Sequence, residues 1–121
     1  MSMKGRPVGR TDFDAEPGRE VSLEAFPLGD RSGLRVNGEI SVTTRMAWRT
    51  VLEELVRQPG DACHADLAQV PFMDVAGATD LVLTAQAMSP GRRIVLHSPP
   101  PQLPRILELF WPEVTEIEVA S

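Results

Sequence analysis

Few side chains in this sequence have the types and the spacing that catalysis or metal binding requires. Cys63 and His64 are adjacent, so on a strand their side chains point to opposite faces and cannot act as a nucleophile and its base. His64 and His97 can meet across neighbouring strands, but two histidines without a convergent carboxylate make a poor metal centre. The sequence also lacks a glycine-rich phosphate loop. We therefore expect no enzyme activity, no catalytic residue, no metal and no cofactor.

Three acidic residues, Glu39, Asp66 and Asp74, each stand at or just after the end of an expected strand. They could gather at one edge of a sheet, where ligands bind in open α/β folds and where paired carboxylates can do acid and base chemistry. Helix capping and solvation are the more ordinary roles for such side chains. This edge keeps open an alternative function, the sensing of a small ligand or nucleotide.

The segment from Phe72 to Gly77, which reads Phe-Met-Asp-Val-Ala-Gly, is the most informative part of the chain. Asp74 stands where a helix begins, so it can accept hydrogen bonds from free backbone amides, and its charge suits the positive end of the helix dipole. Gly77 has no side chain, so another backbone, from this domain or from a partner, can approach the first turn closely. We expect capping as the first role of Asp74 and direct binding as the second.

The elements that position these residues follow from hydrophobic spacing and from turn residues. Two strands, near residues 21–26 and 34–40, predict an antiparallel hairpin, and Thr43 or Thr44 is the expected N-cap of a helix that ends before Pro59. Strands and helices then alternate, with strands at 62–67, 93–97 and 114–119 and helices at 75–88 and 104–110. This order predicts an α/β fold with a mixed sheet, in which right-handed crossovers place the helices mainly on one face.

Length, charge and composition limit the choice of partner and of compartment. A chain of 121 residues has room for one core, and we expect a disordered segment at 1–20 and a domain at 21–121. The net charge of -5 disfavours nucleic acids and anionic membranes as partners. One cysteine fits a reduced cytoplasm, and no apolar run is long enough for direct membrane insertion. We expect a cytoplasmic protein that binds another protein or a small ligand.

The order of the elements and four local strings resemble the STAS domain family, which includes bacterial anti-sigma factor antagonists and subunits of transporters. The strings are Gly38-Glu39-Ile40, Asp66-Leu67-Ala68, Phe72 to Gly77, and Leu103 to Leu109, and the resemblance spans about residues 20 to 119. It implies a small STAS-like fold and a non-catalytic protein-interaction module in signal transduction and transcription regulation. The implied partner is an anti-sigma factor or another serine-kinase-like protein. A STAS subunit of a transport system is an alternative.

Family members that switch carry a serine or threonine after the aspartate, and a partner kinase phosphorylates it. Here that position is Val75, which cannot accept a phosphate, and Ala76 cannot either. The nearest hydroxyl on the same helix is Thr79, a weak candidate for a phosphoacceptor, whose first interpretation is an ordinary helix threonine. The resemblance therefore implies a surface that is either locked in the unmodified state or vestigial.

The partner-binding surface that this resemblance implies combines the end of the second strand with the start of the second helix. Ser41 in it stands where the family commonly has an aspartate. Trp111 is a candidate anchor for a partner or a homodimer if it is exposed, because tryptophan is enriched in interface hot spots. The expected contact residues are Gly38, Glu39, Ser41, Thr43, Phe72, Met73, Asp74, Val75, Ala76, Gly77 and Thr79.

Overall fold

The computed structural model describes residues 22–120, so the predicted disordered segment, residues 1–20, lies outside the described residues. Within these described residues, five strands, three α-helices and one short 3-10 helix follow one another. In order they are β1 (Glu24–Pro27), β2 (Gly33–Asn37), η1 (Val42–Thr44), α1 (Arg45–Val56), β3 (Ala62–Gln69), α2 (Val75–Gln86), β4 (Arg93–His97), α3 (Gln102–Phe110) and β5 (Ile117–Val119).

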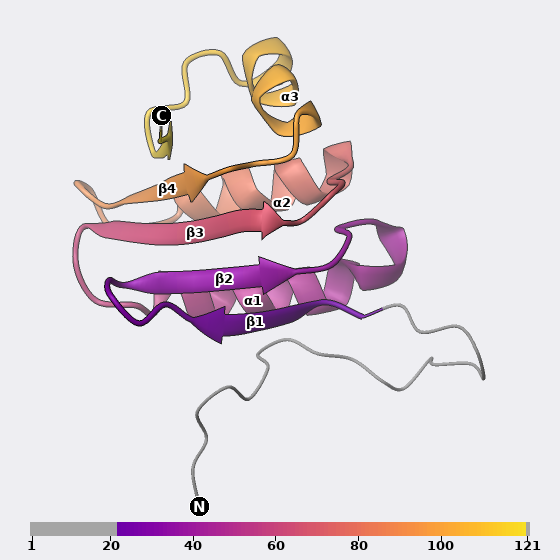
Figure 1. Ribbon diagram of the computed structural model, residues 1–121. Coiled ribbons are helices and arrows are strands. Elements are labelled where there is room, and N and C mark those ends of the chain that lie inside the picture. Colours follow the sequence, from indigo (N-terminus) through magenta and orange to yellow (C-terminus); the bar gives the residue numbers. More distant parts are fainter. Residues whose placement is uncertain (1–21, 121) are drawn as a thin grey trace, which may run out of the picture.

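The five strands form one mixed sheet in the order β1-β2-β3-β4-β5. β1 and β2 pair antiparallel, and every later pair is parallel. The helices α1 and α2 lie side by side on the same face of the sheet, and α3 lies beyond β4 (Figure 1). The predicted α/β fold, with an N-terminal hairpin, parallel strands and helices mainly on one face, is confirmed.

The core fills the space between the sheet and the helices α1 and α2. Trp48 from α1 is 1 % exposed, and its indole Nε1–H donates a hydrogen bond of 3.0 Å to the backbone oxygen of Gly77 in α2. Helical spacing in the sequence predicts an inner face of α2 made of Ala78, Leu81, Val82 and Ala85, and these residues are buried. These apolar side chains hold the two helices at fixed positions on the sheet.

α1 begins at Arg45 with Thr44 as its N-cap residue, one of the two residues predicted, although the Thr44 side chain makes no capping hydrogen bond. Thr44 is buried, and its hydroxyl donates to the backbone oxygen of Glu39 at 2.7 Å instead of capping the helix. The same oxygen, Oγ1, accepts the backbone N–H of Ser41 at 3.0 Å. Thr44 therefore joins the end of β2 to α1 and satisfies loop backbone groups that would otherwise be unpaired.

Candidate functional site

The residues expected to contact a partner lie at the edge of the sheet where β2 and β3 end and where α1 and α2 begin (Figure 1). Here the segment that follows β2 runs beside the loop that precedes α2. The backbone N–H of Ile40 donates to the oxygen of Phe72 at 2.9 Å, and the N–H of Asp74 donates to the oxygen of Ile40 at 3.1 Å. The structure thus brings together the two stretches that the sequence analysis singled out.

Gly77 lies against this domain's own residues. A Cβ atom at Gly77 would come within 2.6 Å of Ile40 Cγ2 and 3.1 Å of Met73 Cγ, closer than atoms in proteins normally approach. Met73 and Gly77 are both buried. Met73 and Gly77 therefore pack beneath the surface residues of this site and present no side chain to a partner.

Asp74 caps α2, as its position in the sequence predicted. Its Oδ1 accepts the backbone N–H of Gly77 at 2.8 Å, so one of the four free amides of the helix start is satisfied. The side chain remains partly accessible. Capping does not preclude contact with a partner, because a carboxylate has further lone pairs to share.

Val75 is the first residue of α2 and is 48 % exposed. Thr79, the weak candidate for modification, donates its hydroxyl to the backbone oxygen of Val75 at 2.8 Å. This bond is the ordinary i to i-4 bond of a helix threonine, and the role of Thr79 as a phosphoacceptor stays a prediction.

Five exposed apolar side chains lie at the start of α1, just before α2 and on α2. We call this surface the apolar α1–α2 face and define it by Val42, Met46, Phe72, Val75 and Leu83, which are 80, 67, 38, 48 and 57 % exposed. The sequence analysis missed three of these residues, Val42, Met46 and Leu83. Leu83 could have been predicted from helical spacing, because it stands eight residues, or just over two turns, after Val75 and so lies on a similar side of the helix.

A charged cluster joins α1 to α2. Asp80 is the only charged residue within Val75–Gln86, and Arg45 binds it through two hydrogen bonds, from Nε to Oδ2 at 2.9 Å and from Nη2 to Oδ1 at 3.1 Å. Arg49 adds an ion pair at 3.5 Å. The hydrogen bonds from Arg45 hold the pKa of Asp80 below its ordinary value and raise the pKa of Arg45. Two guanidinium groups thus share one carboxylate.

The remaining expected residues lie at the turn after β2. Gly38 has a φ of +123°, and a Cβ there would come within 2.7 Å of the backbone oxygen of Ser22, so this position requires glycine. Glu39 and Thr43 are exposed, and the hydroxyl groups of Ser41 and Thr43 lie 3.1 Å apart in a hydrogen bond. Glu39, Ser41 and Thr43 can therefore meet a partner, whereas Gly38 sets the path of the turn.

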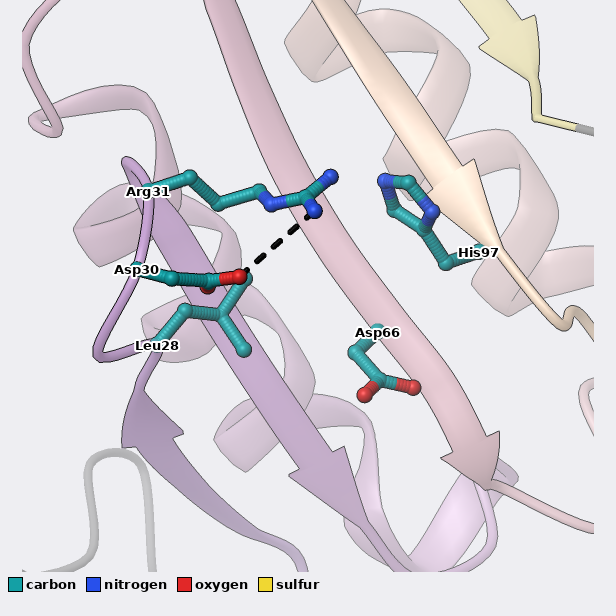
Figure 2. Close-up of a pocket in the computed structure, with 5 residues that line it drawn as sticks. All are labelled: Leu28, Asp30, Arg31, Asp66 and His97. Atoms are coloured by element: carbon teal, nitrogen blue, oxygen red, sulfur yellow. Dashed lines mark ion pairs between the residues drawn. The ribbon is translucent and has the colours of Figure 1, made fainter.

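The acidic residues expected to gather at one edge take separate roles. Asp74 caps α2, whereas Asp66 lines a hollow of about 150 Å³ on the face of the sheet away from α1 and α2 (Figure 2). In this hollow the side chains of Arg31 and His97 point toward each other across β3, and Asp30 pairs with Arg31 at 3.6 Å. A hollow of this size is about half the volume of a small ligand site, which usually starts near 300 Å³.

His64 and His97 do meet across β3 and β4, and a hydrogen bond of 2.8 Å joins His64 Nδ1 to His97 Nε2. Cys63 lies on the opposite, buried side of β3, where Arg92 Nη2 donates to its sulfur at 3.0 Å. Burial raises the pKa of the Cys63 thiol, and Arg92 opposes this effect. Within residues 22–120, no group of three or more histidine, cysteine, aspartate or glutamate side chains is placed to hold a metal ion.

Comparison with known proteins identifies the family of this chain. Residues 28–111 match the protein family described as Mlab, STAS domain, while no curated protein matches the chain. The matched range runs from the residue after β1 through the end of α3, so it contains the whole apolar α1–α2 face. Among the described residues, no helix has the length and the apolar character needed to cross a membrane. The match covers more than half of the sequence, and the chain therefore belongs to the STAS domain family.

Proposed function

We propose that this STAS domain is a non-catalytic interaction module that binds an anti-sigma factor of the serine-kinase type, or a related signalling protein, through the apolar α1–α2 face. The observation that carries this proposal is the exposure of Val42, Met46, Phe72, Val75 and Leu83 at the start of α1 and along α2. Exposed apolar patches of this kind mark interaction sites. Burial of the exposed half of Val75 alone contributes about 1 kcal/mol to association.

The proposed surface is active without modification. Val75 has no hydroxyl group, and the hydroxyl of Thr79 is bonded to the backbone of its own helix. A phosphate would add about -1.5 to -2 charges to an interface that depends on apolar contact. We infer that the domain binds its partner constitutively and that control lies with the partner or with the amount of this protein.

The small-ligand alternative has less support, because the hollow at Asp66 and His97 is only about 150 Å³. A role as the STAS subunit of a transport system would use the same apolar α1–α2 face. Neighbouring genes separate these two settings, since a kinase-like anti-sigma gene indicates the signalling circuit and a transporter operon indicates the transport system.

The test is a pull-down from a lysate of the host, with mass spectrometry of the captured proteins. The wild type is compared with Val75→Asp and with the control Leu109→Asp, which changes a 74 % exposed leucine on α3. Aspartate in the first turn of a helix suits the helix dipole, so Val75→Asp should fold normally. We expect the wild type and Leu109→Asp to retain a serine-kinase-like or sigma-related protein that Val75→Asp loses. Equal capture by all three proteins would show that the start of α2 is not the interface.

A second measurement addresses the switch itself. Mass spectrometry of the protein isolated from its host should find no phosphate on Thr79, because that hydroxyl is engaged with the oxygen of Val75. Stoichiometric phosphate on Thr79 would show that the switch has moved from the usual position, and that binding is not constitutive.

A further inference from the structure

A second apolar surface lies at the other end of the sheet, between α3 and β5. Here a groove of about 340 Å³ is lined by Leu107 and Trp111 on the α3 side and by Val114, Ile117 and Val119 on the β5 side. Trp111 is half-buried against the core, and Val119 is 44 % exposed. We call this surface the α3–β5 groove. It is separate from the apolar α1–α2 face, with which it shares no residue.

The strand that borders this groove has a free edge. β5 pairs only with β4 in the described sheet, through bonds such as the one from Ile94 N–H to the oxygen of Glu116 at 2.8 Å and the one from Ala120 N–H to the oxygen of Leu96 at 2.9 Å. Backbone groups of a strand alternate in direction, so the N–H and C=O of Ile117 and Val119 point away from β4. Such an edge is a template for another strand.

The surroundings of the groove are acidic. Residues 102–120 contain four glutamates and one arginine, and one of the glutamates, Glu118, is paired with Arg93 at 2.9 Å. Glu108 lines the groove itself, and Glu113 and Glu116 line an adjoining hollow of about 420 Å³ that shares Trp111 and Val114 with it. A partner with positive charges is therefore favoured here.

The same charges argue against a second copy of this chain as the occupant. A symmetric dimer places the same patch of both copies face to face, so the patch that holds Glu108, Glu113 and Glu116 would face the same acidic patch of the other copy. Like charges brought together across an interface oppose association. The homodimer that Trp111 suggested from the sequence is thus disfavoured at this groove.

We propose that the α3–β5 groove binds an extended segment of another protein that carries lysine or arginine and adds a strand beside β5. Backbone bonds to Ile117 and Val119 would supply affinity, and apolar side chains of the segment would enter the groove beside Trp111. Lysine or arginine in the segment would meet the glutamates. The domain would then hold two partners at once, one on this groove and one on the apolar α1–α2 face.

The test uses the full chain labelled with nitrogen-15 and a short synthetic peptide in which valine and threonine alternate and both ends carry lysines, since strict alternation of valine and lysine would turn every lysine away from the groove. We expect this peptide to shift the amide signals of Ile117 and Val119 and the indole signal of Trp111, and to bind more weakly as the salt concentration rises. A matched peptide with glutamate in place of lysine should cause no shift. Equal shifts with both peptides, or shifts confined to α2, would overturn the proposal.

Variants sharpen the test. Val119→Pro removes the N–H that points away from β4, so it should weaken binding of the lysine peptide about tenfold while leaving the sheet paired. Glu113→Lys combined with Glu116→Lys should also weaken it. Val75→Asp is the control and should bind the peptide as the wild type does, so this proposal and the proposed function can fail independently. A dimer that forms at high concentration and is lost in Val119→Pro would identify a second copy as the occupant and overturn the proposal.

Discussion

Arg45 on α1 binds Asp80 on α2 through both of its carboxylate oxygens, at 2.9 and 3.1 Å. The side chain of Asp80 is only 8 % exposed, and Arg49 approaches the same carboxylate at 3.5 Å. Charge-assisted, two-point pairs of this kind fix geometry as well as contribute energy. This pair therefore sets the position of α2 relative to α1, and with it the shape of the apolar α1–α2 face.

Replacement of the carboxylate should destabilise the domain. Asp80→Asn leaves the guanidinium groups of Arg45 and Arg49 opposite a neutral amide, and we expect the free energy of unfolding to fall by about 1–3 kcal/mol. Urea denaturation followed by circular dichroism measures the change. The matched control is Glu54→Gln, which breaks the surface pair of Glu54 with Arg57 at 3.5 Å and should change stability by less than about 0.5 kcal/mol. Equal losses in the two variants would contradict a special role for Asp80.

The same pair predicts how stability depends on pH. The hydrogen bonds and charge of Arg45 hold the folded-state pKa of Asp80 below its ordinary value. Its contribution is therefore present above the unfolded pKa of about 3.9 and is lost as the pH falls through the folded pKa. Denaturation curves between neutral pH and about pH 2 should show that the free energy of unfolding falls more on acidification for the wild type than for Asp80→Asn. Parallel curves for the two proteins would refute the assignment.

Asp74 offers a way to separate capping from recognition. Asp74→Ala removes the oxygen that accepts the N–H of Gly77, and the free energy of unfolding should fall by about 1 kcal/mol. Asp74→Asn keeps a capping oxygen and should retain most of that stability, although it removes the charge. If the asparagine variant is stable and still captures the partner, Asp74 acts through the helix; if it is stable and captures nothing, the carboxylate contacts the partner.

Much of this fold could be predicted from local sequence, because hydrophobic spacing is a local property. The strand at 93–97 has the predicted bounds, and the buried positions of α2 are those whose spacing predicted an inner face. The register of the sheet then follows from which face of each strand is apolar. The location of the candidate site also follows, since strand ends and helix starts meet at one edge in α/β folds.

The pairing of charges could not be predicted, because it depends on how the two helices pack. By sequence, Arg49, Glu53 and Arg57 stand four residues apart on a solvated helix face, which favours pairs within α1. In the structure Arg49 turns to Asp80 on the other helix, and Arg57 pairs with Glu54.

Gly77 is the residue on which the close contact of α2 with the end of β2 depends. Alanine has a higher helix propensity than glycine by about 1 kcal/mol, but a methyl group there would lie 2.6 Å from Ile40 Cγ2. We expect Gly77→Ala to lower the free energy of unfolding by about 1–3 kcal/mol, because a packed core must shift to make room. Thr79→Ala on the same helix is the control and should leave stability unchanged within about 0.5 kcal/mol. A Gly77→Ala protein more stable than the wild type would show that Ile40 and Met73 move aside at little cost.

His64 should titrate below its ordinary pKa of about 6.5. Burial lowers its pKa most, and the charges of Arg31, His97 and Arg93 act in the same direction, while Asp30 acts against them. We expect Arg31→Gln to raise the pKa of His64 in an NMR titration, whereas Arg57→Gln, a change on α1, should leave it unaltered. Since the folded state favours the neutral ring, this histidine should cost stability as the pH falls from about 6.5 toward the folded pKa. A His64 pKa at or above its ordinary value would contradict this prediction. A His64 pKa that does not change in Arg31→Gln would also contradict it, and would mean that the Arg31 side chain points away from the histidine pair in solution.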